Sequence, residues 1–196
     1  MRLGYWSSLG AFAFSAAYSI AQVAQLLHLL PDPLDRILIF APSLALAPCF
    51  VLALAAAYEE RRSREDGAAR LGAFALALLY AACAGLVYVN QLGVVIPRDL
   101  AGTASGFARL ACCGFREPLT VVDLLGYTYM SLATLLLAPT CRGWLRGLLL
   151  ANGLLALPIF LQLFWPVLIW AASPWLIVFP WAMLLLAGEL RRTARR

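Results

Sequence analysis

The chain has 196 residues, 63% of them hydrophobic, and its mean hydropathy is +0.84. Soluble domains use about 45–50% apolar residues, so this composition excludes a water-soluble globular protein. The net charge of +5 comes from arginines at the ends of apolar segments rather than along one basic face, which excludes nucleic acid as a partner and favours a lipid bilayer.

Six apolar segments are predicted to cross a membrane as helices, because each supplies the roughly 20 mostly apolar residues that a span needs. In chain order they cover 5–29, 36–58, 70–91, 118–138, 144–164 and 174–190. The first is too long for the apolar region of a signal peptide, so we expect it to be retained. The sequence predicts one all-α domain over residues 1–196, an integral membrane bundle of about six transmembrane helices.

Residues 92–117, between the third and fourth spans, carry too much charge and glycine for a seventh span. Two interpretations stay open. The segment is either an ordered external loop or an amphipathic helix on the membrane surface, with Leu100, Phe107, Leu110 and Ala111 on its apolar face. If it covers the mouth of the bundle, it acts as a lid.

The arginines predict the orientation, since cytoplasmic flanks of membrane helices are enriched in basic residues. Eleven lie on one side of the predicted bundle: Arg2, Arg61, Arg62, Arg64, Arg70, Arg142, Arg146, Arg191, Arg192, Arg195 and Arg196. The other side has four: Arg36, Arg98, Arg109 and Arg116. Together with a composition typical of a GC-rich bacterial gene, this predicts a multi-pass protein of the bacterial inner (plasma) membrane with both termini in the cytoplasm.

Polar side chains occur inside the spans, where each is costly and therefore a functional hypothesis. The predicted topology puts them in the outer half of the bilayer. We predict Asp123 and Tyr127 as catalytic residues, and as ligand-binding residues Tyr18, Gln22, Gln25, Asn90, Gln91 and Gln162. The alternative is structural, because buried amides and hydroxyls commonly only join membrane helices by hydrogen bonds.

No cofactor or metal site is predicted. The five cysteines, at 49, 83, 112, 113 and 141, form no CxxC and no Cys/His spacing, and His28 is the single histidine. A bis-histidine haem needs a second histidine, and a retinal Schiff base needs a lysine, which the chain lacks. P-loop, GxSxG and HExxH motifs are also absent from the sequence.

Motifs in five of the predicted spans together resemble an uncharacterised family of small six-span bacterial integral membrane proteins. They are Tyr5-Trp6 in the first span, Ala41-Pro42-Ser43-Leu44 in the second, Tyr88-Val89-Asn90-Gln91 in the third, Asp123-Leu124-Leu125-Gly126-Tyr127 in the fourth, and Trp144-Leu145-Arg146 with Ala151-Asn152-Gly153 in the fifth. The resemblance implies the bundle and its orientation but no activity. A weaker likeness is to small multi-span membrane terpene cyclases, which implies Asp123 as the acid and aromatic rings that stabilise carbocations. Those enzymes pair two carboxylates, whereas only Asp123 lies well inside a span here.

Three functional hypotheses follow. The favoured one is a protein that binds a small amphiphile or lipid, or a partner membrane subunit, in a polar cleft of the outer leaflet around Asp123. The alternative is an intramembrane acid–base enzyme of the cyclase or isomerase type, acting on an isoprenoid or lipid-like substrate with Asp123 as the acid. The second alternative is a small secondary transporter.

Overall fold

The computed structural model describes residues 2–59, 67–103, 110–114 and 117–193, and within these ranges it is helical, without a strand. The α-helices are α1 (Arg2–Leu26), α2 (Leu34–Glu59), α3 (Gly67–Asn90), α4 (Ile96–Leu100), α5 (Pro118–Leu137), α6 (Gly143–Leu154), α7 (Ala156–Leu161), α8 (Ile169–Ala172) and α9 (Trp175–Thr193). A π-helical turn, Gln91–Val95, joins α3 to α4, and short 3₁₀ turns cover Ala138–Thr140 and Pro166–Leu168.

Six continuous stretches of the described chain are long and apolar enough to cross a membrane: Arg2–Leu26, Leu34–Glu59, Gly67–Leu100, Pro118–Thr140, Gly143–Leu161 and Pro166–Arg192. The prediction of an all-α bundle is confirmed, and so is the prediction of about six helices that are long and apolar enough to be spans. The shorter helices complete spans: α6 and α7 form the fifth, while α8 and α9 belong to the sixth.

The third stretch extends further than the sequence predicts. The predicted span ends at residue 91, but the helix continues to Leu100 through the π turn Gln91–Val95. A π turn widens the helix locally and lets it pass a proline, which has no N–H to donate. The rest of the predicted external segment is described only at 101–103, 110–114 and 117; Phe107 and its neighbours in 104–109 lie outside the described residues, as do 115–116.

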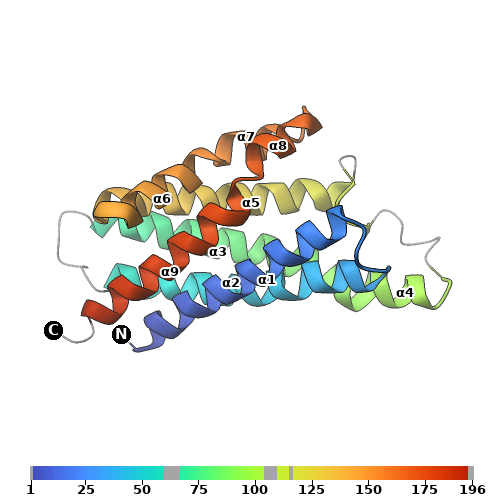
Figure 1. Ribbon diagram of the computed structural model, residues 1–196, viewed down its shortest axis with the longest axis horizontal. Helices are drawn as coiled ribbons and strands as arrows, with labels where there is room; N and C mark the ends of the chain where they lie inside the picture. Colours follow the sequence, from blue (N-terminus) through green and yellow to red (C-terminus); the bar gives the residue numbers. More distant parts are fainter. Residues whose placement is uncertain (1, 60–66, 104–109, 115–116, 194–196) are drawn as a thin grey trace.

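The six spans close into a ring. Each packs against its chain neighbours, in the order α1, α2, α3, α5, α6 and α9, and α9 returns to α1. Figure 1 shows these helices lying lengthwise beside one another, with the start of α1 and the end of α9 at one end of the bundle and α4 at the other. Gly4, near the start of α1, is accordingly close to Ala56 of α2 and Leu190 of α9.

The third span shows how side chains divide between the inside and the outside of the bundle. In α3 the inward face carries Ala73, Ala77, Tyr80, Ala84 and Tyr88, which are buried. The outward face carries Leu71, Leu78, Leu79, Leu86 and Val89, which are exposed. In a bilayer an aliphatic exterior has no hydrophobic penalty, and small interior residues let helices approach closely.

Interhelical hydrogen bonds reinforce the ring. Ser8 and Ser19 of α1 donate to the carbonyls of Met183 and Leu176 of the sixth span, both at 2.8 Å. Asn152 of α6 donates to Thr134 Oγ1 of α5 at 2.9 Å. Such bonds contribute about 0.6–2 kcal/mol each in membrane bundles.

Gly153 sets the contact between α6 and α5. A Cβ atom placed there would lie 2.5 Å from Leu135 Cβ and 2.8 Å from Leu135 Cα, and the second of these is backbone that cannot turn away. We therefore expect Gly153→Ala to lower the stability in detergent by roughly 1–3 kcal/mol through overpacking.

The matched control is Gly147→Ala in the same helix, where an added Cβ would meet nothing within 4 Å. Alanine is the better helix former, so its effect is neutral or slightly stabilising. The midpoint of thermal unfolding in detergent measures both variants. Equal midpoints for the two would refute the close-contact account.

Candidate functional site

Asp123 of α5 is joined to two tyrosines from neighbouring positions of the bundle. The Tyr88 hydroxyl of α3 donates to Asp123 Oδ1 at 2.7 Å and lies 2.9 Å from the Tyr127 hydroxyl. A hydroxyl has one proton to donate, so Tyr127 donates in the second bond when Tyr88 serves Asp123. The result is a hydrogen-bonded chain from Tyr127 through Tyr88 to the carboxyl group.

Aromatic rings surround this chain on the side of Tyr127. The Tyr127 ring centroid lies 5.2 Å from that of Trp175, 6.1 Å from that of Tyr80 and 6.3 Å from that of Tyr18. Tyr18 and Trp175 also meet edge to face, with 5.6 Å between centroids. The cluster therefore draws rings from α1, α3, α5 and α9 to one place.

Two polar atoms in this aromatic cluster lack a hydrogen-bond partner within the described part of the chain: Tyr80 Oη and Trp175 Nε1. Tyr80 is 1% exposed and Trp175 is 5% exposed, so lipid or bulk water does not satisfy them. An unsatisfied polar group costs free energy, particularly at membrane depth, and calls for an explanation such as a ligand or an ordered water.

Asp123 itself is half-buried. In the ranges that the structure describes, Arg36 forms ion pairs with Asp32 and Asp99, whereas Asp123 forms none. A carboxyl group within a membrane span thus has a tyrosine hydroxyl as its partner but no cation. The Asp123 side chain is partly exposed, and no cation among the described residues pairs with it if it is ionised.

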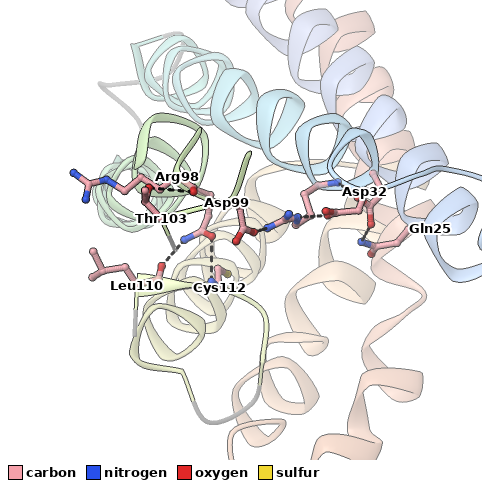
Figure 2. Close-up of polar contacts among 10 residues, drawn as sticks. Gln25, Asp32, Arg98, Asp99, Thr103, Leu110 and Cys112 are labelled. Carbon is pink, nitrogen blue, oxygen red and sulfur yellow. Dashed lines mark hydrogen bonds and ion pairs between the residues drawn. The ribbon is translucent and has the colours of Figure 1, made fainter. Parts of the chain in front are cut away.

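The segment 110–114 is held over the start of α5. Gln91 binds it twice: its Nε2 donates to the Leu110 carbonyl at 2.7 Å, and its Oε1 accepts from the Cys112 N–H at 3.2 Å (Figure 2). The Cys113 N–H donates to Thr120 Oγ1 at 2.8 Å. The pKa of the Cys112 thiol is raised, mainly by a hydrogen bond with the Cys113 side chain and secondly by burial of the thiol.

The other predicted ligand-binding amides lie elsewhere. Gln22 donates to Gln25 Oε1 at 3.3 Å, and Gln25 donates to Asp35 Oδ2 at 2.8 Å, so this pair ties α1 to the start of α2. Asn90 donates to the Leu86 carbonyl of its own helix. Gln162 is buried directly after α7, and its backbone N–H donates to the Pro158 carbonyl at 3.2 Å.

A second polar network closes the same end of the bundle. Arg36 Nε binds Asp32 Oδ1 at 2.6 Å, and its Nη1 binds Asp99 Oδ2 at 2.8 Å, which links the start of α2 to α4 (Figure 2). The side chains of Asp32 and Asp99 are 68% and 40% exposed, so these ion pairs add little stability. They link the start of α2 to α4 and do not involve Asp123.

The structure brings together Tyr18, Asp123 and Tyr127 of the predicted site residues, and Gln91 acts on the segment that covers Asp123. Sequence reasoning assigned no role to Tyr80, Tyr88 or Trp175. Tyr80 and Tyr88 recur at helical spacing on one face of the third span, and this spacing could have indicated them in the sequence. Trp175 is buried, whereas Trp6, Trp144, Trp165, Trp170 and Trp181 are more than half exposed.

The fold and the apolar exterior of the described spans define a multi-pass membrane protein, and a lipid bilayer is its environment. Comparisons with models of known protein families, with curated proteins and with solved structures give no match. The resemblance to a six-span bacterial family and the weaker likeness to terpene cyclases therefore stay predictions.

Proposed function

We propose that this protein binds a small amphiphile with a cationic head at Asp123. The observation that carries the proposal is the half-buried Asp123 carboxyl group, which lies within a membrane span and has no basic partner in the described chain. An ionisable group at membrane depth is rare and costly unless it has a function. A bound cation supplies the missing charge.

The rings beside the carboxyl group favour the same kind of ligand. The faces of tyrosine and tryptophan attract cations, and quaternary ammonium groups are commonly bound by such clusters. Tyr18, Tyr127 and Trp175 gather their rings within 6.3 Å of one another, measured between centroids. The unsatisfied Tyr80 hydroxyl and Trp175 indole N–H add hydrogen-bonding capacity for a polar linkage near the head.

The orientation follows from the arginines. Arg70, Arg191 and Arg192 belong to the end of the bundle where α1 begins and α9 ends, while α5 begins at the opposite end (Figure 1). If the arginine-rich end faces the cytoplasm of a bacterial inner membrane, Asp123 lies in the outer half of the bilayer. The amphiphile then enters from the outer leaflet.

Ligand binding is tested with tetraphenylphosphonium on the purified protein in detergent. We expect Asp123→Asn to weaken its binding at least tenfold, because the amide keeps an oxygen for the Tyr88 hydroxyl but loses the charge. Tetraphenylborate has nearly the same shape and the opposite charge, so its weak binding is not reduced by the substitution.

The control variant is Asp99→Asn, which removes an exposed carboxylate at the same end of the bundle. It should bind the phosphonium ion like the unmodified protein. Unchanged phosphonium binding by Asp123→Asn, with the variant folded, contradicts the proposal.

Topology is tested separately by fusions in bacterial cells. Green fluorescent protein at the C-terminus should fluoresce, since it folds in the cytoplasm, and alkaline phosphatase fused after Gly102 should be active, since it requires the periplasm. The reverse pattern would put the site in the inner leaflet and remove the outer-leaflet part of the proposal.

An intramembrane acid–base enzyme is the second candidate. The hydrogen-bonded chain from Asp123 through Tyr88 to Tyr127 favours it, because it joins the two predicted catalytic residues and offers a path for a proton. A tertiary carbocation formed by protonating an isoprenoid double bond would meet the same aromatic rings.

The enzyme is distinguished from the binding protein by product formation. Incubation of the protein with a polyprenyl substrate, followed by mass spectrometry, should show a cyclised or isomerised product that Asp123→Asn abolishes and Tyr127→Phe reduces. Turnover that survives Asp123→Asn eliminates this carboxyl group as the acid, and the absence of any product in the unmodified protein favours binding alone.

A further inference from the structure

Three possible metal ligands meet at the edge of the site. The Sγ atoms of Cys112 and Cys113 and a carboxylate oxygen of Asp123 all lie within 4.8 Å of one another. The two thiols come from the segment 110–114 and the carboxylate comes from α5, so the cluster forms only when this segment lies over the helix. No spacing motif in the sequence predicts it.

The backbone of the segment is held in an unusual conformation that presents both thiols. Cys113 has a φ of 86°, in a region that residues with a Cβ rarely adopt. Its N–H is fixed by Thr120 Oγ1, and the preceding N–H is fixed by Gln91 Oε1. Such strain persists only where the surroundings impose it, and it is concentrated at ligand-binding and catalytic sites.

We propose that Cys112, Cys113 and Asp123 bind a thiophilic divalent metal ion of the zinc class. Zinc bonds to sulfur and carboxylate oxygen are about 2.3 Å and 2.0–2.2 Å, so tetrahedral ligand atoms lie about 3.5–3.8 Å apart. The observed separations, all within 4.8 Å, need to contract by at most about 1 Å. Both thiols release their protons to solvent on binding, and the fourth position is left for water or an external ligand.

The ligand types select the metal. Two thiolates favour soft or borderline ions over magnesium and calcium, and the carboxylate favours zinc over copper(I), which prefers sulfur alone. The Tyr88 hydroxyl donates to Oδ1 of Asp123, and the carboxylate has a second oxygen with which it can bind a metal. A hydrogen bond to a ligating carboxylate is the usual way to orient it.

The metal site goes beyond the proposed amphiphile site but shares its carboxyl group. A bound divalent ion neutralises Asp123, so zinc and a cationic head compete. The two proposals nevertheless fail independently. Substitution of the thiols should remove metal binding and leave phosphonium binding unchanged. A failure of the metal-free protein to bind the phosphonium ion contradicts only the amphiphile proposal.

The test uses Cd²⁺ alone as the probe, added to the reduced full-length protein in detergent. Coordination by two thiolates gives an ultraviolet charge-transfer band that saturates at one ion per chain and is reversed by excess Zn²⁺. We expect Cys113→Ser to weaken Cd²⁺ binding at least tenfold and to lower the band, while Asp123→Asn weakens binding but keeps the band per bound ion.

Cys49→Ser and Cys141→Ser are the matched controls, because each removes a half-buried thiol outside the cluster. Both should bind Cd²⁺ as the unmodified protein does. A second measurement requires no substitution: Zn²⁺, but not Mg²⁺, should slow maleimide labelling of the exposed Cys113 at least tenfold. Equal Cd²⁺ binding by Cys113→Ser and Cys49→Ser, or no protection by Zn²⁺, overturns the proposal.

Discussion

Hydrocarbon offers no hydrogen-bond partner, and this constraint governs where every polar group of the protein lies. The backbone forms helices, in which its N–H and C=O groups hydrogen-bond to one another. Some side chains find their hydrogen-bond partners on neighbouring helices. Ser8 and Ser19 donate to carbonyls of the sixth span, and Asn152 donates to Thr134. Other buried hydroxyls bond within their own helix, as Ser43 does with the Ile39 carbonyl and Thr128 does with the Leu124 carbonyl, and these groups have no need of a ligand.

Against this background, the surroundings of Asp123 differ in kind. Its carboxyl group has a phenolic partner but no charge partner in the described chain, and two buried donors nearby stay unsatisfied. Ser131 Oγ and Asn152 Oδ1 are also buried without a partner among the described residues, so what distinguishes Asp123 from these groups is its ionisable carboxyl group. A purely structural role would favour an uncharged residue at this depth, and for this reason Asp123 is the basis of the proposed ligand site.

The sequence predicts the spans well because hydropathy over some 20 residues is a property of each segment alone. It predicts their ends less well. Gly93 and Pro97 are helix breakers by intrinsic propensity, yet a π turn carries the helix to Leu100. Asp123 and Tyr127 could be found because they share one helix face. Their partner Tyr88 could not, since nothing in the local pattern says that α3 packs against α5 at this register.

The position of the two thiols could not be predicted from the sequence either, because it depends on contacts between distant segments. Cys112 and Cys113 approach Asp123 only because Gln91, at the π turn, binds the segment from one side and Thr120, in the first turn of α5, binds it from the other. The widened turn and the cysteine cluster are therefore parts of one arrangement, in which the irregular end of the third span supplies the support. Gln91 holds Leu110 and Cys112, and Thr120 holds Cys113, so both residues determine where the two thiols lie relative to Asp123.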